Sequence, residues 1–178
     1  MPLIDRPGPQ APIAAEAHGY ESTRPGMFEH IVAALGVNPA EFTLVECGSG
    51  KGNVVAAAAA LGFPGVWGIE LRAELHAHAV AALGRPGALP DTRVEVTLVC
   101  GDAREAPLPP PPLLVYAFNP FGPAIMAQMV DRLAAHHPGG GRLVFAYLWP
   151  KYAHVLDTHP SFARIARAER WAAWERVP

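Results

Sequence analysis

Short apolar runs alternate with amphipathic segments along most of the chain. The apolar runs have the length and boundaries of buried strands, whereas the segments between them repeat apolar residues every three or four positions, as helices do. The pattern predicts strands over 42–47, 65–70, 93–100, 112–118 and 141–149, and helices over 24–37, 53–62, 72–84 and 124–137. Two half-apolar runs within 162–177 predict an antiparallel strand pair at the sheet edge.

This alternation predicts an α/β fold with a doubly wound, mostly parallel seven-stranded sheet, helices on both faces and an antiparallel C-terminal strand pair. The prolines among residues 1–19 predict a flexible N-terminal arm, followed by one domain over 20–178. The proline-rich segment 102–112 is expected to be an extended connector between two strands.

Composition, net charge and cysteine content exclude several kinds of protein. The chain has 178 residues, of which 51% are hydrophobic and 17% charged, as expected for one globular domain. A net charge of −2 and the lack of a basic run argue against a nucleic-acid partner. Two cysteines without metal-ligand spacing indicate buried thiols in a reducing compartment. With neither a signal-peptide pattern nor a long apolar span, we expect a cytoplasmic protein that does not cross a membrane.

The stretch Leu44 to Ala57, LVECGSGKGNVVAA, places Gly48, Gly50 and Gly52 between a strand and a helix. A phosphate-binding P-loop would need an earlier glycine and a Ser or Thr after the lysine, and both are missing. The dinucleotide fingerprint is matched only in part, because Asn53 occupies the position of its third glycine. Small residues here allow a ligand to approach the backbone at the helix N-terminus, which would suit adenosine with an amino-acid tail.

Three acids follow three successive predicted strands. Glu46, Glu70 and Asp102 each stand at or just after a strand end. Ligands of doubly wound sheets bind at the carboxyl edge, and an acid about twenty residues past the glycines commonly holds a ribose. The sequence therefore predicts a nucleoside site at this edge.

In VECGSGKG, GIEL, CGDA and NPFG, in this order and spacing, the chain resembles the class I S-adenosylmethionine-dependent methyltransferases over residues 20–178. With YEST ahead of a helix it looks like small bacterial members and, distantly, the telomeric-silencing lysine methyltransferases. The resemblance implies that Glu46 and the glycine loop hold the methionine part, Glu70 the ribose, and Asp102 with Ala103 the adenine. It further implies that Tyr20 and Thr23, in the segment before the first helix, close over the cofactor. Three further residues would also contact the cofactor, namely Asn53, Leu71 and Asn119.

The motif Asn119-Pro120-Phe121 ends the fourth strand of the predicted core and is the candidate reacting centre. It resembles the Asn-Pro-Pro-aromatic signature of amino-group methyltransferases, with one proline instead of two. An Asn amide oxygen and the backbone carbonyl at Pro120 are suitable acceptors for an amine, and placement of the nucleophile supplies much of the catalysis. Phe121, Trp149 and Tyr152 are expected to line the substrate site. The alternative is a strand-ending turn in which Asn119 only caps.

The sequence thus predicts N-methylation of an amine on a small molecule or a protein side chain. O-methylation, or a cofactor-binding module without catalysis, remains open. No metal site is predicted, because His76 and His78 are two residues apart on a helix and face different directions. The sequence does not determine the oligomeric state.

Overall fold

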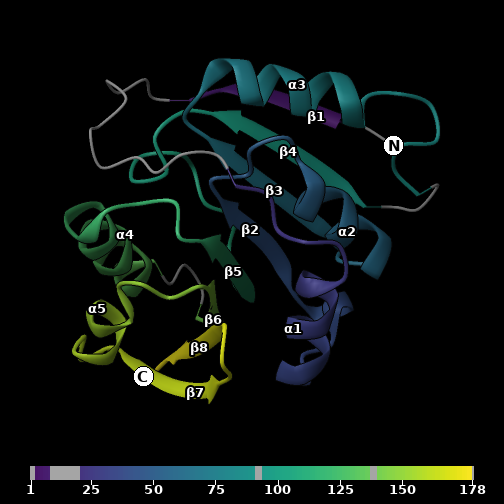
Figure 1. Cartoon of the computed structure of the whole chain (residues 1–178). Coiled ribbons are helices and arrows are strands. Elements are labelled where there is room, and N and C mark those ends of the chain that lie inside the picture. The colour runs from purple at the N-terminus through teal and green to yellow at the C-terminus, as the bar shows by residue number, and fades with distance from the viewer. Residues whose placement is uncertain (1–2, 9–20, 91–93, 137–139, 178) are drawn as a thin grey trace.

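A computed structural model describes residues 3–8, 21–90, 94–136 and 140–177. Its centre is an eight-stranded sheet in the order β1-β4-β3-β2-β5-β6-β8-β7 (Figure 1). The strands are β1 (Leu3–Pro7), β2 (Thr43–Cys47), β3 (Gly65–Glu70), β4 (Glu95–Cys100), β5 (Leu113–Phe118), β6 (Leu143–Leu148), β7 (Phe162–Arg167) and β8 (Trp171–Arg176). The helices are α1 (Met27–Leu35), α2 (Asn53–Leu61), α3 (Ala73–Leu83), α4 (Pro123–Ala135) and α5 (Ala153–Asp157), with a 3₁₀ turn at Pro39–Glu41.

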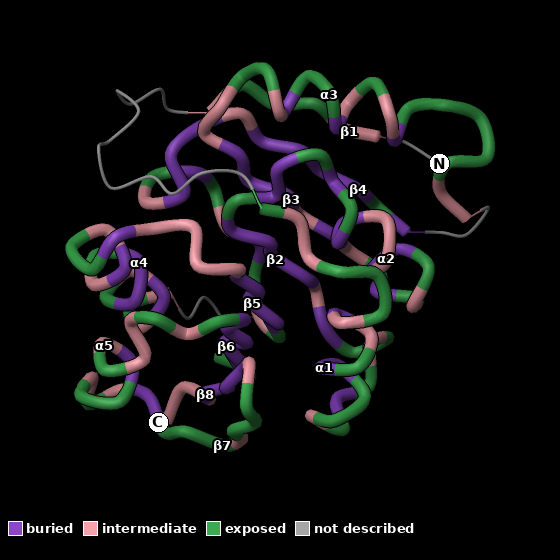
Figure 2. Tube along the Cα trace, viewed as in Figure 1, coloured by how far each residue is buried: buried purple, intermediate pink, exposed green. Residues whose placement is uncertain are grey.

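Helices cover both faces of the sheet. Leu44 in β2 points into a core cluster that includes residues of α1, α2 and α3, whereas its neighbour Val45 points into a second cluster with residues of α4 and α5. Side chains alternate between the two faces of a strand, so a strand covered on both sides must be apolar almost throughout. This is the burial pattern of the central strands in Figure 2.

The predicted parallel core and the antiparallel C-terminal pair are both present. Strands β1 to β6 pair in parallel, whereas β8 is antiparallel to β6 and to β7. The connector 102–112 has neither helix nor strand, as its prolines predicted. Helix α5 was not expected, since five residues are too few to show helical periodicity.

The sheet has eight strands rather than the seven predicted, because the N-terminal segment adds one. Leu3–Pro7 pairs in parallel with β4, in register from Leu3 opposite Val96 to Pro7 opposite Cys100. Asp5 also pairs with the buried His76 of α3 at 2.8 Å. Over these five residues the expected flexible arm is an edge strand, because the exposed edge of β4 supplies hydrogen bonds that no local pattern reveals. Residues 9–19 of the expected arm lie outside the described residues.

Within the described parts of the chain, every helix is too short or too polar to cross a membrane.

Candidate active site

The glycine loop joins β2 to α2 in a conformation that requires glycine. Gly48 has a φ of 78°, and Gly52, the N-cap residue directly before α2, has a φ of 82°. A Cβ on Gly48 would lie 2.8 Å from the Cβ of Pro120, closer than real contacts allow. The loop therefore lies directly against the turn that follows β5, as the sequence predicted for the Asn119-Pro120 motif.

The three predicted acids come from adjacent parallel strands and are all buried. Glu46 lies in β2, Glu70 ends β3 and Asp102 follows β4. Glu70 supports the glycine loop, since its Oε2 accepts from the amide of Gly50 at 2.8 Å and its Oε1 from the amide of Arg72 at 2.9 Å. Each carboxylate oxygen has a second lone pair, so these bonds still allow Glu70 to accept from a diol.

Glu46 is the least satisfied of the three acids. Its Oε2 is buried without a hydrogen-bond partner among the described residues. Burial, reinforced by the negative charge of Glu70, raises the pKa of Glu46 well above its usual range, although a backbone hydrogen bond at Val55 opposes the shift. A cationic donor at this position would satisfy the orphaned oxygen and restore the ionised form.

Asp102 has the opposite electrostatic environment. The Nε and Nη2 of Arg104 donate to its carboxylate at 3.0 and 2.5 Å, and these bonds lower the pKa of Asp102. The next residue, Ala103, is fixed through its carbonyl, which accepts from the guanidinium of Arg132 in α4. The loop after β4 is therefore held rigid, with Asp102 ionised at neutral pH.

The segment before α1 crosses this edge of the sheet. Thr23 is hydrogen-bonded to the hydroxyl of Tyr116 in β5 at 2.9 Å, and Ser22 accepts from the Nδ2 of Asn53 at 2.7 Å. These contacts join the segment to the sheet and to the start of α2. The predicted cofactor residue Tyr20 lies outside the described residues, and Leu71 lies in the turn between β3 and α3.

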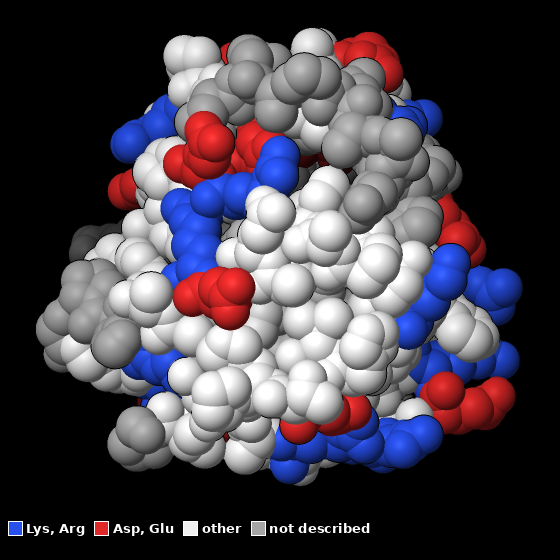
Figure 3. All heavy atoms as spheres, turned by 90° about the vertical axis from the view of Figure 1, so that its left-hand side faces the viewer, with Lys and Arg blue, Asp and Glu red and all other residues white. Residues whose placement is uncertain are grey.

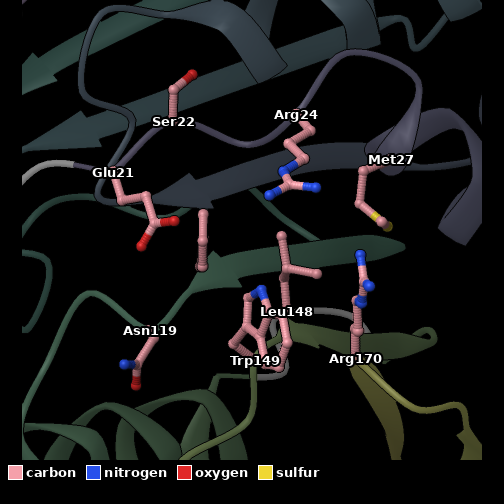
Figure 4. Close-up of a pocket in the computed structure, with 9 residues that line it drawn as sticks. Glu21, Ser22, Arg24, Met27, Asn119, Leu148, Trp149 and Arg170 are labelled. Atoms are coloured by element: carbon pink, nitrogen blue, oxygen red, sulfur yellow. The ribbon is translucent and has the colours of Figure 1, made fainter.

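Two adjoining pockets open along this segment. The first, here the loop pocket, is lined by Glu21, Ser22, Thr23, Glu46, Gly48, Ser49, Asn53, Val54 and Phe118. The second, here the tryptophan pocket, has a volume of about 240 Å³ and is lined by Glu21, Ser22, Arg24, Met27, Phe118, Asn119, Leu148, Trp149 and Arg170 (Figure 4). Glu21, Ser22 and Phe118 belong to both and form the boundary between them.

Asn119 lines the tryptophan pocket, but the oxygen of its side-chain amide already accepts a hydrogen bond. Its Oδ1 accepts from the hydroxyl of Tyr147 at 2.8 Å, and its side chain points away from the Glu21–Ser22 segment in Figure 4. Burial raises the pKa of Tyr147, which keeps the phenol protonated as the donor. Among described non-glycine residues, positive φ occurs only at Asn119 (43°) and Trp149 (49°), both in this pocket. Such strain is frequent at functional sites.

The predicted substrate residues separate into two groups. Trp149 lines the tryptophan pocket, whereas Phe121 and Tyr152 pack against the core cluster on the α4 and α5 side. Sequence reasoning did not single out Arg24 or Arg170. Arg24 directly follows the motif YEST, which was a usable signal, whereas Arg170 lies in the β7–β8 turn and only the folded hairpin brings it to the pocket.

Several solved structures share the fold of this chain. The structure resembles a glycopeptide N-methyltransferase, MtfA, complexed with sinefungin, with a TM-score of 0.66, 15% identity, and coverage of 97% of this chain and 92% of that one. The chain has the class I methyltransferase fold. A scan of protein-family models and a search of curated proteins each give no match.

Other proteins with the methyltransferase fold act on different acceptors. An S-adenosylmethionine-dependent O-methyltransferase from Thermotoga maritima has a TM-score of 0.64 at 18% identity, over 90% of this chain and 68% of that one. An RNA methyltransferase from Salinibacter ruber, in complex with S-adenosylhomocysteine, has a TM-score of 0.57 at 17% identity, over 88% and 92%. The shared fold therefore leaves the acceptor to be inferred from this chain's own pockets.

Charge on the surface is mixed. On the face in Figure 3, Lys and Arg atoms lie beside Asp and Glu atoms around a broad uncharged area.

Within the described residues, no group of three or more His, Cys, Asp and Glu side chains is placed to hold a metal ion.

Proposed function

We propose that this chain is an S-adenosylmethionine-dependent methyltransferase that transfers the methyl group to an amine. The observation that carries the proposal is the buried, orphaned Oε2 of Glu46 beside the glycine loop of a methyltransferase fold. The α-ammonium of the cofactor's methionine part is a cation of the kind this oxygen lacks. At Gly48 the same loop lies against Pro120 with no room for a side chain, so the glycine loop and the Asn119-Pro120 turn are in contact at this edge.

The remaining cofactor contacts follow from the strand ends. Glu70 would accept from the ribose hydroxyls while it continues to brace the loop amide of Gly50. Asp102 and Ala103, fixed by Arg104 and Arg132, would form the adenine end of the site. When bound, S-adenosylmethionine supplies an electrophilic methyl group on a positively charged sulfur.

The acceptor would occupy the tryptophan pocket, next to the boundary with the loop pocket. An amine must lose its proton before it can attack, so it needs hydrogen-bond acceptors aimed at its nitrogen. Glu21, shared by both pockets, would provide a carboxylate, and Asn119, which lines the tryptophan pocket, would provide its backbone carbonyl. The bond from Tyr147 fixes the Asn119 amide, and with it the turn. An in-line attack depends on such positioning.

The test is methyl transfer from labelled S-adenosylmethionine to fractionated cell extract, followed by identification of the methylated atom. Asn119→Ala should reduce turnover by about 100-fold, because loss of the bond from Tyr147 frees the turn that positions the amine. Affinity for S-adenosylhomocysteine should change far less. Asn119→Asp should retain the bond from Tyr147 but shift the optimum pH upward, because a carboxylate stabilises the protonated amine.

Three results would contradict the proposal at different points. Label on oxygen would show that the acceptor atom is wrong. Cofactor binding without formation of S-adenosylhomocysteine, over all extract fractions, would indicate a binding module without catalysis. Normal turnover by Asn119→Ala on the identified substrate would show that the turn fixed by Asn119 does not position the acceptor.

A further inference from the structure

Two arginines give the tryptophan pocket an excess of positive charge. Arg24 reaches it from the segment before α1, and Arg170 from the β7–β8 turn on the other side (Figure 4). Among the described residues, neither guanidinium forms a salt bridge with a carboxylate. Glu21 is the single acid that lines the pocket. Because the chain as a whole has a net charge of −2, this excess is local.

Arg170 is held in place by Trp149. The Arg170 guanidinium carbon lies 5.6 Å from the centroid of the Trp149 ring, and the amide of Trp149 donates to the carbonyl of Arg170 at 2.6 Å. Trp149 is 49% exposed, although it is a large aromatic residue in a left-handed backbone conformation. Stacking on an aromatic ring restricts the guanidinium, so less conformational freedom is lost when it binds an anion.

The acidic and the basic side chains occupy different parts of the tryptophan pocket. Glu21 lies on the boundary with the loop pocket, whereas Arg24 and Arg170 line the tryptophan pocket alone. An amine at the boundary would therefore face a carboxylate, and an oxyanion on the same molecule would face the two guanidiniums. Guanidiniums bind carboxylate and phosphate oxygens through paired N–H donors. The volume of about 240 Å³ suits a small molecule with both groups.

We propose that the methyl acceptor is a small amine that also carries an anionic group, either a carboxylate or a phosphate. The inference rests on the proposed function, since it assigns the substrate class of the same site. In this arrangement Arg24 and Arg170 are specificity-determining residues that recognise the oxyanion, and Trp149 contacts the body of the acceptor.

The experiment measures binding to the full chain saturated with S-adenosylhomocysteine, by calorimetry, with pairs of probes that differ in the anionic group. The carboxylate pairs are 4-aminobutyrate with 4-aminobutanamide and 6-aminohexanoate with 6-aminohexanamide. The phosphate pair is O-phosphoethanolamine with ethanolamine. We expect the anionic member of at least one pair to bind about 10-fold more tightly or better, and the preferred pair identifies the oxyanion.

Charge-removing variants then test the two arginines. Arg24→Gln and Arg170→Gln should each weaken the anionic probe by about 10-fold or more and leave the neutral probe and S-adenosylhomocysteine unchanged. Arg167→Gln is the matched control, because Arg167 is exposed in the same strand pair but does not line the pocket. It should bind both probes as the unmodified protein does.

Equal binding of both members of every pair, or no binding of any probe, would overturn the inference. So would an equal loss of both probes in the arginine variants. Failure of the proposed function has a different signature: S-adenosylhomocysteine does not bind, or labelled S-adenosylmethionine gives no methylated amine although an anionic probe binds in the predicted manner. Binding and transfer measured on the same preparations distinguish the two failures.

Discussion

Replacement of Glu46 by Gln should stabilise the protein and weaken its cofactor site at the same time. Glu46 is buried in β2, its Oε2 has no partner among the described residues, and Glu70 lies close enough to raise its pKa further. Gln has the same shape without the charge. Burial and Glu70 disfavour the ionised carboxylate, and Gln has no charge to disfavour, so Glu46→Gln should increase the free energy of unfolding by about 1–3 kcal/mol at neutral pH.

The raised pKa of Glu46 also determines how this stability difference changes with pH. Because the pKa of Glu46 is raised in the folded state, the folded protein binds more protons than the unfolded chain above the ordinary glutamate pKa. The contribution of Glu46 to stability is therefore lost as pH rises from about 4.5 through the raised pKa. The stability difference between Glu46→Gln and the unmodified protein should widen over this range.

Cofactor affinity should change in the opposite direction. An ammonium that bonds to the ionised carboxylate contributes about 1.5–3 kcal/mol, so Glu46→Gln should weaken S-adenosylhomocysteine by about 10-fold to 100-fold. Binding to the unmodified protein should strengthen with pH as Glu46 ionises, and the variant should lose that dependence. Thermal unfolding and calorimetry at about pH 5.5 and pH 8 measure both effects.

Glu95→Gln is the matched control, because Glu95 is an exposed glutamate at the start of β4. It should leave stability and affinity unchanged. A Glu46→Gln variant that binds S-adenosylhomocysteine as tightly as the unmodified protein at every pH would refute the role of Glu46. A loss of stability in this variant would refute the reasoning that burial of its charge is unfavourable.

Three further predictions concern the same edge of the sheet. Glu70→Ala should weaken S-adenosylhomocysteine by about 10-fold to 100-fold in calorimetry and also lower stability, because Gly50 loses its acceptor. Gly48→Ala should abolish detectable cofactor binding and lower the melting temperature, since its Cβ would collide with Pro120 at a positive φ. Cys47, whose pKa burial raises to about 12, should resist iodoacetamide at pH 8 until the protein unfolds, as mass spectrometry can follow.

The sequence by itself determined the parts of the molecule that depend on local pattern. The central strands are apolar almost throughout because both of their faces are covered, and this pattern is visible in the sequence. Gly48 and Gly52 require positive φ, and the acids at strand ends reach one edge because parallel strands align there. Fold class and the position of the loop pocket follow from these features.

Only the tertiary structure decided which groups are free and which are engaged. Asn119 was predicted to face the acceptor, but the hydroxyl of Tyr147, 28 residues away, binds its amide oxygen. Leu3–Pro7 became a strand because the edge of β4 was open to it. Arg170 reaches the tryptophan pocket because the β7–β8 pair folds back beside β6. Such contacts join residues far apart in the chain, so a local hydrophobic pattern does not predict them.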